Sequence, residues 1–404
     1  MKQRIALGWA GIDVGKGHHW ICLIDEAGTT VRSTKVVNDE AAILDAIAGV
    51  LGHADEVVWG VDVTGTMSGL LLALLAAHGQ RVRYVPGRTV NQMASAYRGE
   101  AKTDARDAYV IAETLRHRGD LQDVEVATAL VTELRLLVTH RTDLVGDQVR
   151  MVTRLRDVLS GYFPALERSF DYAHSRGALV LLTGYQTPQA IRRTGQSRLR
   201  AWLVKRKVRS ADQIAAAALG AAKAQQTVVP GQDVAASIVA DLAAQLLAIG
   251  ARIADLDARI TTTFRAHPQA EIIESLPGMG PILGAELVAA AGDLAAYANA
   301  GRLASAAGLV PVPRDSGRRT GNLHRPMRYP RKLRRVFYLS ASAAMMREGP
   351  SRDYYLKKRG QGHGHVQALI ALVRRRVDVL WALLRDNRPF ELAPPSREPM
   401  AQTA

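Results

Sequence analysis

The pattern of hydrophobic and polar residues in the N-terminal third predicts a mixed α/β domain. Short runs rich in β-branched and apolar residues predict strands. Stretches with apolar residues three and four positions apart predict helices, because that spacing gathers them on one helix face. The order is three strands joined by hairpins, then helix, strand, helix and strand, followed by a further helix. The predicted strands cover 9–14, 18–24, 29–37, 57–63 and 81–85, and the predicted helices cover 40–51 and 67–77.

This order of elements is that of the ribonuclease H fold, in which the first strand lies at the centre of the sheet and the fourth pairs beside it. Asp13 ends the first predicted strand and Asp62 lies near the end of the fourth. Asp104 and Asp107 are three residues apart, so they share a face on the first turn of the late helix. We therefore expect these four carboxylates to converge at one end of the sheet.

Four carboxylates in one site suit divalent-metal chemistry. Like charges held together are unfavourable unless a cation lies between them, and Mg²⁺ binds carboxylate oxygens. Two Mg²⁺ ions about 3.5–4 Å apart, with Mn²⁺ as a substitute, would support phosphoryl transfer. The alternative is an ordinary acidic first turn, in which Asp104 and Asp107 only complement the helix dipole.

The middle of the chain predicts long helices. Apolar residues keep helical spacing over 133–159 with Arg135, Arg150 and Arg154 among them, and over 234–264 they repeat close to a heptad. These two segments would form a coiled coil within one chain or across a dimer, and the pattern does not distinguish the two. Residues 192–209 hold eight Arg and Lys and no acid, which suits an RNA or DNA backbone.

The C-terminal third carries two more candidate sites. Gly278 and Gly280 lie in the turn LPGMGP, which has the form of a helix-hairpin-helix element that grips phosphate through backbone N–H groups. The alternative is a tight helix–helix turn. Ser316 follows in a Gly/Pro-rich loop, where its hydroxyl is a weak nucleophile until it is activated. The basic residues around this loop and on the helix after it are Arg314, Arg318, Arg319, Arg331, Lys332, Arg334 and Arg335.

The charge distribution points to a nucleic-acid partner. The 404-residue chain has a net charge of +15, and residues 314–376 hold 17 Arg and Lys against three acids, which is 17 − 3 = +14. Cys22 is the only cysteine, which excludes an internal disulfide and a multi-cysteine zinc site. The sequence has no signal peptide and no uninterrupted apolar run of about 18 residues. We therefore expect a cytoplasmic, nucleoid-associated protein rather than a membrane protein.

Five motifs in register along the chain carry a family resemblance. They are GIDVGKG, WGVDVTG, KTDARDA, the LPGMGP turn, and GLVPVPRDSG followed by the basic helix LRRVFYLSASAAMMR. From about Gly11 to Arg385 the chain resembles the DEDD transposases of the insertion sequence 110 family, relatives of the Piv DNA invertases. The resemblance implies a RuvC-like domain (1–125), a coiled-coil region (126–268), a mainly α C-terminal transposase domain (269–390) and a disordered tail (391–404).

The resemblance also implies roles for single residues. Asp13, Asp62, Asp104 and Asp107 would be the metal-binding acids, although the family's second acid is commonly Glu. Ser316 would form a transient phosphoserine link to DNA, in a composite site with another protomer of a dimer or tetramer. A structured bridge RNA would pair with donor and target DNA. A Holliday-junction-resolvase-like hydrolytic nuclease and a catalytically decayed nucleic-acid-binding protein are the alternatives.

Overall fold

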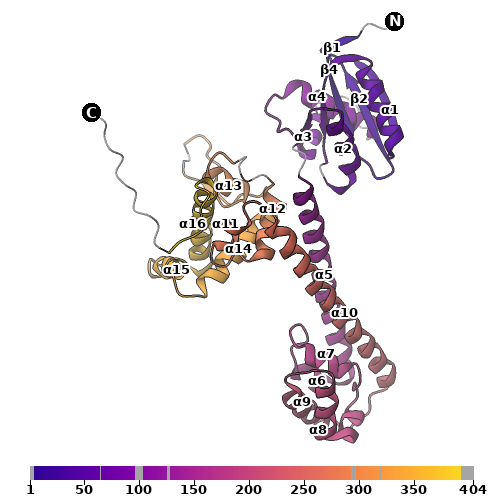
Figure 1. Ribbon diagram of the computed structural model, residues 1–404, viewed down its shortest axis with the longest axis vertical. Helices are drawn as coiled ribbons and strands as arrows, with labels where there is room; N and C mark the ends of the chain where they lie inside the picture. The colour runs from indigo at the N-terminus through magenta and orange to yellow at the C-terminus, as the bar shows by residue number, and fades with distance from the viewer. Residues whose placement is uncertain are drawn as a thin grey trace, which may run out of the picture. The chain divides into compact units, whose positions relative to one another are not determined.

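The computed structural model describes residues 4–63, 65–95, 103–124, 128–292, 294, 297–318 and 320–392 (Figure 1). Two compact units divide the chain, Met1–Ala127 and Thr128–Ala404. Arg319 and the part of the predicted tail from residue 393 onward lie outside the described residues.

A five-stranded mixed sheet forms the first unit, in the order β3-β2-β1-β4-β5. Strand β1 pairs antiparallel with β2 and parallel with β4, β2 is antiparallel to β3, and β4 is parallel to β5. The first strand is therefore central with the fourth beside it, as the element order predicted. The strands are β1 (Ile5–Asp13), β2 (His18–Ile24), β3 (Thr30–Val37), β4 (Ala54–Val61) and β5 (Val82–Tyr84).

Helices cover both faces of this sheet. Alternate residues of β1 point to opposite faces, so Ala10 and Ile12 pack in the core beneath α1 and α2 while Trp9 packs toward α3 and α4. The sequence pattern predicted α1, α2 and α4 but not α3, and the first two residues of the helix predicted over 67–77 belong to the 3₁₀ turn η1. The helices are α1 (Glu40–Leu51), the 3₁₀ turn η1 (Thr66–Ser68), α2 (Gly69–Ala77), α3 (Gly87–Ala94) and α4 (Asp104–His117).

Helix α4 packs directly on the backbone of the central strands. A Cβ built on Gly11 would lie 2.1 Å from the carbonyl oxygen of Ala108, and one built on Gly60 would lie 2.5 Å from the Leu115 side chain. No side chain larger than hydrogen fits at Gly11, because the obstructing atom is backbone. These two glycines therefore set how closely α4 approaches β1 and β4.

The second unit is built on two long helices, α5 (Ala129–Tyr162) and α10 (Gln232–Arg265), which contain the two predicted helical segments. The helices pack against each other within the chain, and Arg141 of α5 forms an ion pair with Asp257 of α10. Glu133, earlier in α5 than Arg141, contacts Thr263, which is later in α10 than Asp257. The two helices are therefore antiparallel. The two segments thus pair within one chain, which is one of the two possibilities that the heptad pattern left open.

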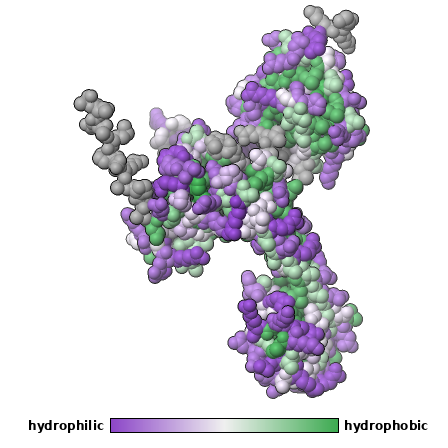
Figure 2. Space-filling view, viewed as in Figure 1, coloured by the Kyte–Doolittle hydropathy of each residue, from purple (hydrophilic) through white to green (hydrophobic). Residues whose placement is uncertain are grey.

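Four shorter helices, here called the α6–α9 subdomain, lie between α5 and α10 in sequence. They are α6 (Pro164–Ser169), α7 (Arg176–Leu182), α8 (Pro188–Lys205) and α9 (Ala211–Lys223). Tyr162, Phe163, Leu166 and Leu181 are in their shared core, which also takes in Leu246 of α10. In the view of Figure 2, hydrophilic residues cover much of this subdomain around a small hydrophobic area.

The C-terminal part of the second unit is helical apart from one short hairpin. Helix α14 matches the predicted basic helix that follows the Ser316 loop. The elements are α11 (Ala270–Ser275), α12 (Pro281–Ala291), α13 (Ala300–Ala306), β6 (Val312–Pro313), β7 (Leu323–His324), α14 (Arg331–Met345), α15 (Pro350–Gly360) and α16 (His365–Arg385).

One helix qualifies the expectation about membrane spans. By length and composition alone, α10 is apolar enough to cross a membrane, with a mean hydropathy of 1.8 over an 18-residue window. Asp241 interrupts the apolar run in sequence, which is why counting uninterrupted residues missed it. The core helix of a soluble protein passes the same test, so this finding alone is weak evidence for a membrane span.

Candidate active site

Two of the predicted acids lie at the ends of neighbouring parallel strands. Ile12 of β1 pairs with Val61 of β4, and Asp13 and Asp62 are the next residues along. Side chains two residues apart in a strand point to the same face. Asp13 and Asp62 should therefore point to the α4 side of the sheet, as Gly11 and Gly60 do.

Helix α4 carries the other two acids to the same end of the sheet. Its N-terminus is fixed by Thr103, whose hydroxyl oxygen accepts a hydrogen bond from the Arg106 backbone N–H at 3.3 Å. Ala108 lies against Gly11, so the turn bearing Asp104 and Asp107 lies beyond it, where β1 ends. The close contact between α4 and β1 thus places all four acids near one edge.

The surroundings of Asp62 disfavour the charged form of its carboxyl group. Burial raises the pKa of the Asp62 carboxyl above its usual range. The negative charge of Asp107 raises this pKa further, whereas hydrogen bonds from the backbone N–H groups of Asp62 and Val14 lower it. The Oδ1 atom of Asp62 is buried and accepts no hydrogen bond within the described part of the chain. A bound cation would therefore stabilise the charged form of this carboxylate.

Asp104 has a partner that the sequence reasoning missed. The Nε2 atom of His18, at the start of β2, lies 3.0 Å from Oδ2 of Asp104. The two side chains are partly exposed, at 37% and 55%. Nothing in the spacing of His18 pointed to this contact, because the residues are far apart in sequence and meet only through the packing of α4 on the sheet.

The donor set suits a hard divalent cation, since it consists of carboxylate oxygens and includes the unsatisfied Oδ1 of Asp62. In the described residues, however, no group of three or more His, Cys, Asp and Glu side chains is arranged to hold a metal. The chemistry of the acids therefore fits a metal, while a complete coordination shell would require their side chains to move closer together.

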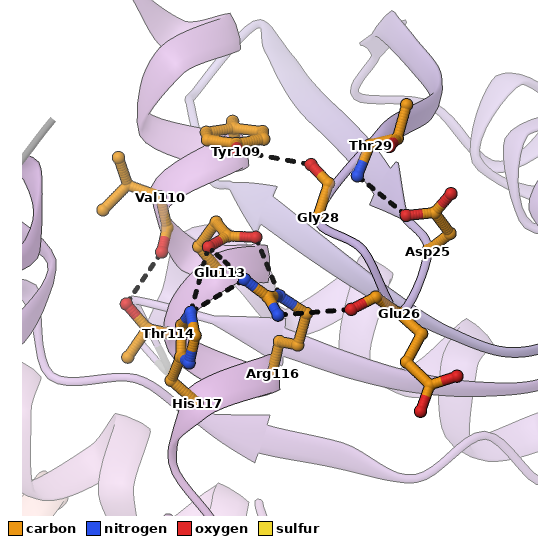
Figure 3. A network of polar contacts seen from close by, with 10 residues as sticks. All are labelled: Asp25, Glu26, Gly28, Thr29, Tyr109, Val110, Glu113, Thr114, Arg116 and His117. Atoms are coloured by element: carbon orange, nitrogen blue, oxygen red, sulfur yellow. Dashed lines mark hydrogen bonds and ion pairs between the residues drawn. The ribbon is translucent and has the colours of Figure 1, made fainter. Parts of the chain in front are cut away.

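A buried polar network holds the other half of α4 in place (Figure 3). Glu113, whose side chain is only 3% exposed, accepts two hydrogen bonds of 2.9 Å from Arg116. Arg116 in turn donates to the carbonyl oxygen of Glu26 at 3.2 Å, and the Tyr109 hydroxyl donates to that of Gly28 at 3.3 Å. These contacts tie α4 to the turn between β2 and β3, and so fix the helix that carries Asp104 and Asp107.

Ser316 belongs to the second unit and lies in the exposed loop of the β6–β7 hairpin. The loop is closed by a hydrogen bond of 2.8 Å from the Arg314 backbone N–H to the Asn322 carbonyl oxygen. Asp315 Oδ1 also accepts one of 2.9 Å from the Asn322 N–H. Arg314 and Arg318 are exposed on either side of Ser316. The hairpin thus presents a hydroxyl between two cations.

The Gly-rich turn is used partly for packing. Gly278 has φ +78°, and a Cβ there would lie 2.6 Å from the Ser340 carbonyl oxygen of α14, whereas the space around Gly280 is open. Arg376, which sequence reasoning missed, is 3% exposed and donates to the Pro277 carbonyl oxygen and, at 2.6 Å, to the Ser340 hydroxyl. Burial lowers the pKa of Arg376 to about 10. It fixes the turn against α14 and α16.

Several of the predicted basic residues also have internal contacts. Arg335 forms an ion pair with Glu286, Arg334 donates to the Gly308 carbonyl oxygen at 3.0 Å, and Arg150 pairs with Asp147. Arg135 donates to the Ala289 carbonyl oxygen at 3.3 Å. Arg154, Arg331 and Lys332 are exposed.

Comparison with known proteins decides the family. A family model described as "Transposase" matches residues 10–164, and one described as "Transposase IS116/IS110/IS902 family" matches residues 270–356. The chain is 61% identical over 387 residues to the uncharacterized 44.8 kDa protein of insertion element IS116 from Streptomyces clavuligerus, covering 96% of this chain and 97% of that protein. It is 51% identical to the IS900 42 kDa protein of Mycobacterium paratuberculosis, over 95% and 97%.

The chain belongs to the IS116/IS110/IS902 family of transposases.

This transposase is accordingly an enzyme that cleaves and rejoins DNA, as the five motifs predicted. Part of it, 34% of the chain, is also 28% identical to the pilin gene-inverting protein of Moraxella bovis, over 45% of that protein, which confirms the expected relationship to the invertases. The first family model spans all four aspartates and the second spans Gly278 and Ser316. Most of the α6–α9 subdomain falls between the two matched ranges.

Proposed function

We propose that the first unit of this transposase is a ribonuclease-H-like catalytic domain in which Asp13, Asp62, Asp104 and Asp107 form the reaction centre. The sheet order β3-β2-β1-β4-β5 supports the fold assignment. The observation that carries the site is Asp62, whose buried Oδ1 has no hydrogen-bond partner in the described chain and whose pKa is raised mainly by burial and further by the charge of Asp107. Without a cation this arrangement lowers the stability of the fold, which favours a functional role for these acids over a purely structural one.

A divalent cation, Mg²⁺ or its substitute Mn²⁺, would be held by these four carboxylates. When bound, such an ion activates an attacking oxygen or stabilises a leaving one. The shorter Asp62 in place of the family's usual Glu is compatible with this role, because its Oδ1 has no other partner in the described chain. His18 would orient Asp104 through their 3.0 Å contact.

Ser316 would act as the nucleophile of the reaction. Its Oγ attacks a DNA phosphorus, forming an Oγ–P bond while the bond from phosphorus to one deoxyribose oxygen breaks. The serine proton leaves to a base and the departing oxygen takes a proton. Reversal with a different strand end reseals the DNA, so no external energy source is needed. Arg314 and Arg318 beside the loop would neutralise the phosphate during attack.

Two partners complete the proposal. A structured bridge RNA would supply sequence recognition, which the excess of basic residues supports without naming the RNA. A homo-oligomer, a dimer or tetramer, would bring Ser316 of one protomer to the acids of another. Its support is α10, where Val234 and Ile238 are 67% and 44% exposed on an apolar helix. Sequencing the RNA that copurifies, and measuring the mass in solution, test these two parts separately.

The decisive experiment is to trap the protein–DNA adduct. The protein, together with the RNA that copurifies with it, is incubated with radiolabelled substrate DNA and Mg²⁺, quenched with denaturant and resolved on a denaturing gel. We expect a covalent adduct with wild type and none with Ser316→Ala. Ser305→Ala, a substitution of an exposed serine in the same unit, is the matched control and should give the wild-type adduct.

The outcomes separate the alternatives. An adduct that persists in Ser316→Ala removes the serine assignment. Cut DNA without any adduct in wild type supports a hydrolytic nuclease instead. Asp62→Ala with wild-type strand exchange would show that Asp62 has no part in the reaction.

A further inference from the structure

The α6–α9 subdomain contains two adjoining pockets that the catalytic proposal does not use. The larger has a volume of about 630 Å³ and includes Arg176, Lys207 and Arg209 in its lining. The second is lined by Arg156, Glu167, Arg168, Ser169, Phe170 and Asp171, and Arg156 and Glu167 form an ion pair of 2.7 Å. Asp171 lines both, so the two pockets are neighbours, and together they are here called the α6–α9 groove.

Close packing at one glycine forces the cations of the larger pocket together. A Cβ on Gly177 would lie 2.8 Å from Val208 and 2.4 Å from Ile214, so the start of α7 and the loop before α9 are in tight contact. Val208 is buried, and its two neighbours in sequence are Lys207 and Arg209. Burying Val208 against Gly177 therefore holds both cations beside Arg176.

These cations have no counter-charge of their own. No carboxylate in the described chain pairs with Arg176, Lys207 or Arg209, and all three side chains are exposed. Asp171 is the only acid in the larger pocket, and it binds His174 at 2.7 Å. With a neutral His174 the pocket carries 3 − 1 = +2 charges. Cations gathered in a concavity repel one another until an anion enters.

Other basic residues of the 192–209 stretch make contacts within the chain. Arg192 donates to the Ala222 and Gln225 carbonyl oxygens, and Arg206 stacks 3.6 Å above the Trp202 ring. Lys207, in contrast, adopts φ +58°, a left-handed conformation that is uncommon outside glycine. The fold thus holds Lys207 in an unfavourable backbone conformation at the pocket while it uses other cations of the stretch internally.

We propose that the α6–α9 groove binds the phosphodiester backbone of a nucleic acid. An isolated phosphate would need only the larger pocket, but the neighbouring pocket adds the exposed Arg168, which no carboxylate pairs in the described chain. Cations spread along an open groove fit a chain of phosphates rather than one. The contact is independent of sequence, because it consists of charges without base-edge readers.

This site is separate from the basic helix of the C-terminal part. Arg135 of α5 contacts α12, and Tyr162 at the other end of α5 enters the α6–α9 core. The helix between them is 162 − 135 = 27 residues long, which corresponds to about 40 Å. The groove would hold nucleic acid at one end of α5 while α14 holds it near the other. The proposal requires neither the metal site nor Ser316 chemistry.

The test compares two triple variants of the full-length protein. Arg176→Gln/Lys207→Gln/Arg209→Gln removes the groove cations. Arg193→Gln/Lys205→Gln/Lys223→Gln is the matched control, because it removes the same charge from exposed positions that do not line either pocket. Binding of a fluorescent duplex DNA and of an RNA hairpin with equal phosphate number is followed by anisotropy as salt is raised.

We expect the groove variant to bind at least one probe roughly 10-fold to 100-fold more weakly at low salt, with a salt slope reduced by about two to three, since each lost phosphate contact lowers it by about 0.9 for duplex DNA. The probe that loses more affinity identifies DNA or RNA as the source of the phosphates. The control variant should change both the affinity and the salt slope much less.

Several results would overturn the proposal. Equal losses in the two variants would mean that only net charge matters. Displacement of the probes by low-millimolar inorganic phosphate at fixed ionic strength would assign the groove to a free anion, and displacement by poly-glutamate alone would assign it to an acidic protein. Matching thermal unfolding curves exclude misfolding; if the triple variant unfolds, Arg176→Gln and Arg209→Gln are measured singly, each with a slope change of about one. The anisotropy assay measures binding and not cleavage, so failure of the serine chemistry cannot be mistaken for failure of the groove.

Discussion

Replacing Asp62 by Asn should make the metal-free transposase more stable while it abolishes activity. The carboxylate of Asp62 is partly buried, lies near the charge of Asp107 and has an unsatisfied Oδ1. Asn keeps the shape and one acceptor, which can still receive the Val14 N–H. It replaces the second oxygen by an amide donor, so repulsion from Asp107 becomes attraction.

The size of the gain follows from the unmade hydrogen bond. Leaving a buried acceptor unsatisfied costs about 1–3 kcal/mol, and the partial exposure of Asp62 places it at the lower end, so we expect a gain of about 1 kcal/mol. For a unit of this size that corresponds to a rise in Tm of roughly 4 °C. Asp45→Asn on α1, an exposed acid outside the site, is the control and should change Tm by less than about 1 °C.

Divalent ions should make wild type more stable than Asp62→Asn. A ligand that binds only the folded state at 100 times its Kd adds about 2.7 kcal/mol of stability. Wild type and Asp45→Asn should gain Tm on addition of Mg²⁺ and lose it again with EDTA, whereas Asp62→Asn should respond far less. Three of the five tryptophans, Trp9, Trp20 and Trp59, lie in the first unit, so a Trp202→Phe/Trp381→Phe background makes fluorescence report the unfolding of that unit.

Two results would refute this reasoning. If Asp62→Asn lowers Tm in EDTA, the carboxylate stabilises the empty fold and the repulsion argument is wrong. If wild type and Asp62→Asn gain the same Tm from Mg²⁺, the ion binds elsewhere. The comparison needs no active DNA substrate, so it tests the metal site apart from the reaction.

Three further substitutions test other parts of the fold. Gly278→Ala should lower stability by about 2–4 kcal/mol in denaturant unfolding, because a Cβ would strike α14 at a left-handed φ, while Gly280→Ala should change it by less than about 1 kcal/mol. Lys207→Gly should raise Tm by roughly 2 °C, since it removes about 1 kcal/mol of left-handed strain, and an unchanged or lower Tm would argue against that strain. Glu113→Gln should cost about 2–3 kcal/mol by weakening the charge-assisted bonds from Arg116, and a neutral effect in denaturant unfolding would contradict the structural role of that network.

Local periodicity predicted most of the first unit, because strands and amphipathic helices repeat on the scale of a few residues. The helix over 40–51 was predicted with the bounds that α1 has. The pattern failed where helices are short. Helix α3 has eight residues, and α8 is kinked at Gly195 with φ +73°, so neither gives a long periodic signal.

Side-chain contacts across the fold were beyond the reach of the sequence. The order of elements predicted that four acids would meet, but not that His18 would lie against Asp104 or that Asp62 would have an unsatisfied oxygen. Arg376 likewise looked like one more surface cation among many, and only the packed structure shows that it is buried beneath the Gly278 turn. Charge counted along the sequence does not separate cations that bind the chain from those that are open to a ligand.

The two strand-end acids share a local design that explains why the fold brings them together. Each is preceded by an apolar residue and a glycine: Gly11-Ile12-Asp13 on β1 and Gly60-Val61-Asp62 on β4, paired in register. The middle residue is fully buried in the core beneath α1 and α2, and the glycine on the opposite face lets α4 approach. Asp13 is the last residue of β1 and Asp62 is the first residue after β4, and both should point to the α4 side. The glycines carry no chemistry, yet without them α4 could not bring Asp104 and Asp107 close to Asp13 and Asp62. The candidate site is therefore a property of two matched three-residue segments and one closely packed helix rather than of four separate acids.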